Sequence, residues 1–258
     1  MKMILAVARK ELKSLFASPL AWVVLTFLEL LLAIVFLKRL DEYLEIQSRL
    51  AQMPGAPGAT EMLATPVYAT AAIVMLFAVP LLGMRLVAEE RRNGTLAFLV
   101  SSPLTMTEIV VGKWLGLVAF LLVAIALATL MPLSLALGGR VDWGLVASLV
   151  IGITLTAASF SAVSLYVSSL TVHPLAAGVG AFGALLAMVL AGDTLAENLR
   201  GRGWDIAAAL LQVLMPLRQL EPFTKGVLDS YNAVCALLLI TAFLVLTVRR
   251  LDAARLRG

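Results

Sequence analysis

The sequence predicts an all-α integral membrane protein with six transmembrane helices. Hydrophobic residues make up 61% of the 258 residues and charged residues 14%, with a mean hydropathy of +0.99. A soluble chain carries roughly 45–50% and about 25% of these classes. Six apolar stretches approach the roughly 20 residues that a membrane-spanning helix needs, and none alternates as a β-barrel strand does. A soluble enzyme, a disordered chain, a coiled coil and a DNA-binding domain are therefore excluded as main interpretations.

The six expected spans are rich in Leu, Val, Ala and Ile and carry almost no charge. They cover residues 20–37, 67–87, 114–137, 145–170, 175–191 and 231–248. We interpret the first as a retained helix, because no small-x-small cleavage site of a signal peptide follows it. The chain, residues 1–258, is expected to form a single transmembrane domain.

Basic residues favour a cytoplasmic location for both termini. An even number of spans places both ends on one side of the membrane, and cytoplasmic loops carry an excess of Lys and Arg. That side would hold twelve of the twenty basic residues: Lys2, Arg9, Lys10, Lys13, Arg85, Arg91, Arg92, Lys113, Arg249, Arg250, Arg255 and Arg257. We therefore expect a multi-pass protein with both termini in the cytoplasm. No basic stripe with interleaved aromatic residues indicates a nucleic-acid partner.

Residues 1–18 precede the first span and have an amphipathic pattern. Lys2, Arg9 and Lys13 lie opposite an apolar helical face, which is formed by Ile4, Leu5, Ala8, Leu12, Leu15 and Phe16. This pattern predicts a helix that lies in the membrane surface, with lipid as a partner.

Three further segments are expected outside the spans. Residues 41–66 are predicted to be an outer loop, and residues 88–112 a cytoplasmic loop. Residues 192–230 are predicted to be an outer segment, in which the apolar stretch 206–217 is too short to span. We expect that stretch to form a short re-entrant or interfacial helix before the last span.

The cytoplasmic loop carries the most informative residues. A charged cluster, Glu89, Glu90, Arg91 and Arg92, ends the second span, and Asn93-Gly94 marks a turn. Thr95 can then cap a short helix that displays Leu96, Phe98 and Leu99 and ends before Pro103. This helix is either an interfacial helix that rests on lipid or a docking element for a cytoplasmic partner.

Three motifs in and after this loop resemble the permease subunits of ABC-2-type transporters. They are Glu-Glu-Arg-Arg-x-Gly-Thr-Leu at 89–96, Ser-x-Pro-Leu at 101–104 and Ile-Val-Val-Gly-Lys at 109–113. Lys-Glu-Leu-Lys-Ser at 10–14, and Phe223-x-x-Gly226-x-x-Asp229 before the last span, resemble the gliding-motility-associated branch of that family. The order of segments along the whole chain is also similar.

The resemblance implies a permease that works with ABC ATPase subunits. The loop would be a coupling helix seated on one of two ATPase copies, and the chain would pair with a second permease of the same or a sister type. It would export a substrate across, or transmit force through, a bacterial inner membrane, with a possible extracytoplasmic auxiliary protein. The implied docking residues are Gly94, Thr95, Leu96, Phe98, Leu99, Ser101, Ser102 and Pro103, and the implied outer-segment residues are Pro216, Glu221, Phe223, Gly226 and Asp229.

The chain contains no phosphate-binding loop of its own. Its one Gly-Lys pair, Gly112-Lys113, is preceded five positions earlier by Thr107 and followed by Trp114, which departs from the Walker A pattern. ATP and Mg²⁺ are therefore expected in the partner ATPase, and this chain is expected to hold no cofactor and to have no catalytic residues.

Two other classes of function remain open at this stage. A stand-alone secondary transporter or channel would use polar groups within the membrane, and Glu29, near the middle of the first span, is the candidate. Glu29 lines a pathway, or it is a protonated carboxyl bonded to a neighbouring helix. An intramembrane enzyme is less consistent with the sequence, because the single histidine, His173, and the single cysteine, Cys235, supply no zinc site.

Overall fold

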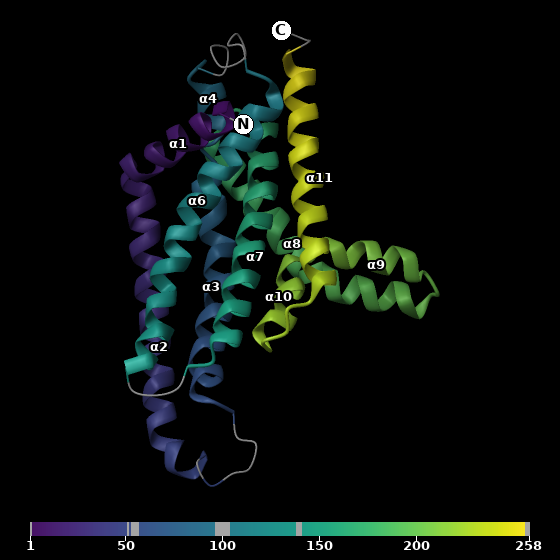
Figure 1. Ribbon diagram of the computed structural model, residues 1–258. Helices are drawn as coiled ribbons and strands as arrows, with labels where there is room; N and C mark the ends of the chain where they lie inside the picture. Colours follow the sequence, from purple (N-terminus) through teal and green to yellow (C-terminus); the bar gives the residue numbers. More distant parts are fainter. Residues whose placement is uncertain (1, 51, 53–56, 96–103, 138–140, 256–258) are drawn as a thin grey trace.

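The computed structural model describes residues 2–50, 52, 57–95, 104–137 and 141–255, and all its elements are helical. The long helices run side by side in an elongated bundle (Figure 1). The elements are α1 (Lys2–Ala17), α2 (Pro19–Leu50), α3 (Ala59–Gly83), α4 (Ala88–Arg92), α6 (Met106–Leu133), a 3₁₀ turn (Ser134–Leu137), α7 (Trp143–Leu170), α8 (Pro174–Gly201), α9 (Asp205–Val213), α10 (Pro216–Thr224) and α11 (Ser230–Arg255).

Five of the described helical stretches are long and apolar enough to cross a membrane. They are Pro19–Leu50, Ala59–Arg92, Met106–Leu137, Trp143–Leu170 and Ser230–Ala253, and a shorter apolar stretch covers Pro174–Leu190. The chain is thus a multi-pass membrane protein. The start of α1, α4 and the end of α11 all lie at one end of the bundle (Figure 1), which we call the loop end.

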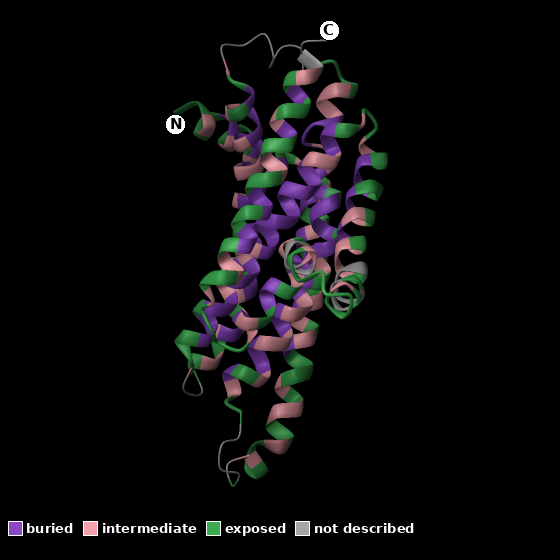
Figure 2. Ribbon diagram, turned by 90° about the vertical axis from the view of Figure 1, so that its right-hand side faces the viewer, coloured by how far each residue is buried: buried purple, intermediate pink, exposed green. Residues whose placement is uncertain are grey.

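Helix α7 forms the centre of the bundle. Of its most apolar window, 72% is buried, against 28% for α2, and buried residues concentrate along the middle of the molecule (Figure 2). The buried face of α7 is rich in small side chains, including Ser148, Gly152 and Thr156. Small residues let neighbouring helices approach closely, as the spacing of these residues predicts.

Two expected loops are shorter than the sequence indicates. Helix α2 continues to Leu50 and α3 starts at Ala59, so most of the expected loop 41–66 is helical. Residues 41–50 contain no Gly or Pro, and an Arg39–Glu42 ion pair of 2.7 Å supports the extension. Polarity in this stretch therefore does not mark the end of the helix.

The expected loop 88–112 is likewise helical at both ends. Helix α4 covers Ala88–Arg92, and α6 begins at Met106, eight residues before the predicted start of the third span. Thr105 and Glu108 form a capping box, in which the Thr105 hydroxyl accepts from the Glu108 N–H at 3.2 Å. This reciprocal cap fixes the start of α6 ahead of its apolar run.

In the expected outer segment 192–230, the structure contains a helix break that the sequence analysis does not predict. The predicted single helix 206–217 is divided between α9, which ends at Val213, and α10, which starts at Pro216. Pro216 has no N–H and disfavours a helical conformation at Met215, whose φ and ψ are −109° and 84°. The C-terminal part of α8 and α9 run side by side and project sideways from the bundle in Figure 1, and they point toward the viewer in Figure 2.

Candidate functional site

Helix α1 packs directly against the first turns of α6 at the loop end. Gly112 and Gly116, one turn apart on α6, lie under α1, where an added Cβ would come within 2.6 Å of the Cβ atoms of Val7 and Glu11 respectively. The buried residues of α1 are Val7, Glu11 and Leu15. The predicted surface helix is therefore held to a spanning helix through a glycine notch, and Leu5, predicted on its apolar face, is 72% exposed.

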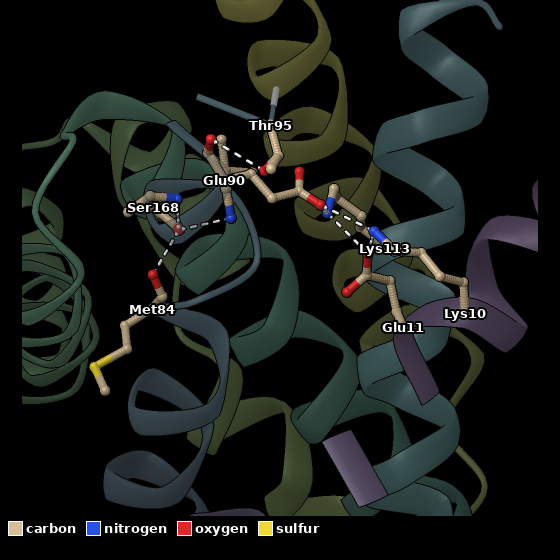
Figure 3. Close-up of polar contacts among 9 residues, drawn as sticks. Lys10, Glu11, Met84, Glu90, Thr95, Lys113 and Ser168 are labelled. Carbon is tan, nitrogen blue, oxygen red and sulfur yellow. Dashed lines mark hydrogen bonds and ion pairs between the residues drawn. The ribbon is translucent and has the colours of Figure 1, made fainter. Parts of the chain in front are cut away.

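Four charged side chains meet where α1, α4 and α6 converge (Figure 3). The Nζ atom of Lys113 lies 2.9 Å from Glu11 Oε1 and 2.8 Å from Glu90 Oε1. The Nζ atom of Lys10 lies 3.1 Å from each of the same two oxygens. We call these four residues the charge cluster; two cations and two carboxylates alternate in it, so its formal charge is zero.

The charge cluster is deepest at Lys113, whose side chain is 1% exposed, while that of Lys10 is 57% exposed. Burial alone would raise the pKa of Glu11, but Lys113 and then Lys10 outweigh it and hold that pKa below its usual value. Burial would lower the pKa of Lys10, but Glu11 and Glu90 raise it. The charges of Glu11 and Lys10 are therefore stabilised by their partners.

A serine of α7 holds the break between α3 and α4. The Ser168 hydroxyl accepts from the backbone N–H groups of Val87 and Ala88 at 3.2 and 3.1 Å, and it donates to the Met84 carbonyl at 3.1 Å. These backbone groups have no helical partner where α3 ends. Helix α7 thereby fixes the direction in which α4 leaves the bundle (Figure 3).

In the described part of the expected loop 88–112, residues 93–95 form a tight turn. Gly94 has a φ of +70°, which confirms the turn predicted from Asn93-Gly94. The Thr95 hydroxyl donates to the Glu90 carbonyl at 3.3 Å. The predicted docking residues Leu96, Phe98, Leu99, Ser101, Ser102 and Pro103 lie outside the described residues.

The four charges predicted to support the loop have different surroundings. Glu90 belongs to the charge cluster, whereas Glu89 lies 3.9 Å from the Arg85 Nε atom at the surface. Arg91 is partly buried on α4 and Arg92 is exposed. Of these four residues, only Glu90 therefore takes part in the charge cluster.

The outer-segment residues form an anchor and a turn, far from the charge cluster in sequence. Phe223 of α10 is 2% exposed and packs where an added Cβ on Gly152 of α7 would come within 2.6 Å of the Phe223 Cβ. The Ser148 hydroxyl donates to the Phe223 carbonyl at 3.0 Å. Gly226 then turns the chain with a φ of +76°, and Asp229 accepts from the Tyr231 N–H at 3.0 Å at the start of α11.

The remaining two outer-segment residues have simple positions. Pro216 is buried in the first turn of α10. Glu221 is at the surface and pairs with Lys225 at 2.8 Å. Both residues are far from the charge cluster along the chain, and their contacts support helix α10 itself.

Glu29 is partly buried on α2 and does not join the charge cluster. Its Oε1 atom is buried and has no hydrogen-bond partner among the described residues. The neighbouring-helix hydrogen bond that one interpretation expected is therefore not seen for that oxygen. Among the described residues, no group of three or more His, Cys, Asp or Glu side chains could hold a metal ion.

Sequence reasoning missed the cluster itself. Lys10, Glu11 and Lys113 lie within motifs that the sequence highlights, but nothing in a single sequence pairs residues about 100 positions apart. One signal was available, because Lys113 is a lone charge directly before an apolar run and Glu11 falls next to the apolar face of its helix. Such charges require partners when they are buried.

Comparisons with known proteins agree with this architecture. The family model described as "ABC-2 family transporter protein" matches residues 5–256. No curated protein matches the chain. Because the match covers nearly the whole chain, from within α1 to beyond α11, this protein belongs to the ABC-2 family of transporter membrane proteins.

Proposed function

We propose that this permease couples ATP hydrolysis by a separate ABC ATPase to export or force transmission across a bacterial inner membrane. In this proposal the loop end faces the cytoplasm, as the basic residues favour. The shorter apolar stretch Pro174–Leu190 also spans the membrane, as the fifth of six spans in chain order. Two ATPase copies, which bind ATP and Mg²⁺, and a second permease complete the transporter.

The charge cluster is the observation that supports this proposal most strongly. Glu90 lies before the proposed docking segment 94–103, Lys113 lies after it, and their ion pair of 2.8 Å joins the two sides of that segment. Glu11 adds α1 to the same unit. Removing one partner of a buried pair costs about 3–5 kcal/mol, so a push on the loop moves α1, α4 and α6 together instead of deforming the loop.

The docking contact itself is assigned to residues 94–103. Gly94 turns the chain, and the apolar residues Leu96, Phe98 and Leu99 are the proposed anchors in a groove of the ATPase. Burying one Phe or Leu side chain contributes roughly 1.5–3 kcal/mol, and aromatic residues often dominate interfaces. Arg91 and Arg92 orient the segment at the membrane surface.

The test replaces two anchors with a charged residue. The double variant Phe98→Asp, Leu99→Asp is expected to lose co-purification with the partner ATPase, because two buried carboxylates would oppose docking. The measurements are co-purification and the ATPase rate in lipid. The matched control is Val227→Asp, Leu228→Asp, an adjacent apolar pair that is 54% and 62% exposed in the outer turn. A double variant at 98 and 99 that keeps both partner and coupled activity would refute the docking assignment.

Glu29 is proposed to line the transport pathway between the two permeases. Its buried, unpartnered Oε1 atom suits a group that meets substrate, water or the second permease. Glu29→Gln is expected to keep assembly and stability, because an amide still forms hydrogen bonds, while Glu29→Leu is expected to change ATP-driven activity. If both variants match the wild type in activity, Glu29 has no role in the pathway.

A further inference from the structure

A cleft of about 380 Å³ opens beside the charge cluster, between α1, the start of α2, the end of α3 and α4. Its volume is within the ~300–1,000 Å³ typical of small-molecule sites. Neither the family match nor the proposed docking of an ATPase assigns an occupant to it.

The walls of this cleft change from apolar to charged along the bundle. Leu20, in the first turns of α2, and Leu82, in the last turn of α3, supply an apolar wall next to the spans. Arg85, Glu90 and Asn93 lie further toward and within α4 and supply the polar wall. A cleft graded in this way, where two spanning helices end, matches the boundary between acyl chains and headgroups.

Arg85 supplies a site for an anion within the cleft. A guanidinium has five N–H donors. Arg85 Nη1 donates to the Ser18 hydroxyl at 2.9 Å, and Nε lies at the long distance of 3.9 Å from Glu89. The side chain is 41% exposed. Donors therefore remain for a phosphate, which Arg binds through parallel hydrogen bonds.

Glu90 supplies a site for a cation in the same cleft. Both lysines of the charge cluster form ion pairs with its Oε1 atom. Its Oε2 atom is buried and has no hydrogen-bond partner among the described residues. The charged groups that line the cleft are Lys10 and Arg85 against Glu11, Glu89 and Glu90. A purely anionic headgroup would leave the Oε2 atom unpaired, whereas a primary ammonium can donate to it.

We propose that this cleft binds a phosphoethanolamine headgroup of a membrane lipid, with the phosphate on Arg85 and the primary ammonium on Glu90. The apolar wall formed by Leu20 and Leu82 receives the start of the acyl chains. A lipid bound there lies against α1, α3 and α4, and so against the elements that the charge cluster joins.

The first test needs no variant and compares headgroups on the purified full chain in detergent. Native mass spectrometry measures binding of phosphatidylethanolamine, phosphatidylcholine and phosphatidylglycerol with identical acyl chains. The quaternary ammonium of phosphatidylcholine cannot donate a hydrogen bond, and phosphatidylglycerol has no ammonium. We expect about tenfold tighter binding of phosphatidylethanolamine than of either, which corresponds to about 1.4 kcal/mol. Equal binding of the three lipids would overturn the proposal.

Variants then assign the two contacts. Arg85→Gln is expected to weaken all three lipids about tenfold, and Glu90→Gln is expected to remove the preference for phosphatidylethanolamine while leaving phosphatidylcholine unchanged. The matched control is Lys38→Gln, an exposed basic residue of α2 away from the cleft. Arg85→Gln and Lys38→Gln with the same effect would refute the assignment.

A competition experiment distinguishes a membrane lipid from a soluble molecule that carries the same headgroup. Glycerophosphoethanolamine is expected to compete only at concentrations far above those of the lipid, because it lacks acyl chains for the apolar wall. Binding as tight as that of the lipid would refute a membrane ligand. The chain is assayed without an ATPase, so a failure here leaves the docking test at 98 and 99 unaffected.

Discussion

Two non-spanning helices are attached to the bundle by the same device at different places. Helix α1 lies on Gly112 and Gly116 of α6, and α10 lies on Gly152 of α7. In both contacts the missing Cβ allows close approach. The α1 contact adds the charge cluster, whereas the α10 contact adds one neutral hydrogen bond from Ser148.

The two contacts are suited to different roles. A glycine notch with a neutral hydrogen bond fixes a position and is insensitive to charge. The charge cluster joins three elements, and it is disrupted only by leaving a buried ion unpaired. The α1 contact is therefore suited to keep parts together while they move, and the α10 contact to hold one segment in place. Three substitutions or conditions test this contrast.

The largest effect is expected from Lys113→Met. The substitution leaves Glu11 and Glu90 with only the exposed Lys10, and removing one partner of a buried pair costs about 3–5 kcal/mol of unfolding free energy. Thermal unfolding in lipid nanodiscs measures the change. The double variant Lys113→Met, Glu11→Leu is expected to recover part of the loss, because it removes a carboxylate that lost its partner. A single variant as stable as the wild type would show that the cluster contributes no stability.

A smaller effect is expected from filling the glycine notches. Gly116→Ala and Gly152→Ala each place a Cβ 2.6 Å from a neighbouring Cβ, so a helix must shift. Overpacking of this kind costs about 1–3 kcal/mol. Gly183→Ala is the control, because no atom lies within 4 Å of its Cβ position. We also expect Gly116→Ala, but not Gly152→Ala, to lower coupled ATPase activity; equal activities would remove the functional contrast.

The smallest effect is expected from acid. The pKa of Glu11 is lowered in the folded protein, so its contribution to stability is present above its ordinary value of 4.5 and is lost as the pH falls through the folded value. The stability advantage of the wild type over Glu11→Gln should therefore shrink as the pH falls below 4.5 and through the lowered pKa of the folded protein. Unfolding temperatures of both proteins across this range provide the check. Ser148→Ala should show no such pH dependence, because its hydrogen bond is neutral.

Much of the fold follows from the sequence, because apolar length is a strong signal. The first four expected spans and the last one lie within the five long helices, and Asn93-Gly94 forms its turn. The helices differ from the expected segments at their ends and at the break between α9 and α10. Apolar length alone does not locate the start of α6, because the Thr105–Glu108 capping box begins the helix ahead of its apolar run.

The site was less accessible to sequence reasoning than the fold. Glu90 was predicted to support the loop, but its partners Glu11 and Lys113 lie on helices whose packing a single sequence does not reveal. In the sequence, the Phe223-x-x-Gly226-x-x-Asp229 motif indicates a resemblance but no physical role. The structure shows the physical use of each position: a buried anchor, a left-handed turn and a hydrogen bond at a helix start.

The long separation of the cluster residues along the chain has a consequence for biosynthesis. Glu11 precedes Lys113 by 102 positions, which at ribosomal rates of about 5–20 residues per second is a delay of roughly 5–20 s. During that delay the carboxylate of Glu11 must remain in water or at the headgroups. An amphipathic α1 on the membrane surface satisfies this requirement, and only the arrival of α6 allows it to dock. Helix α1 precedes α6 along the chain but therefore reaches its final position only after α6 has been synthesised.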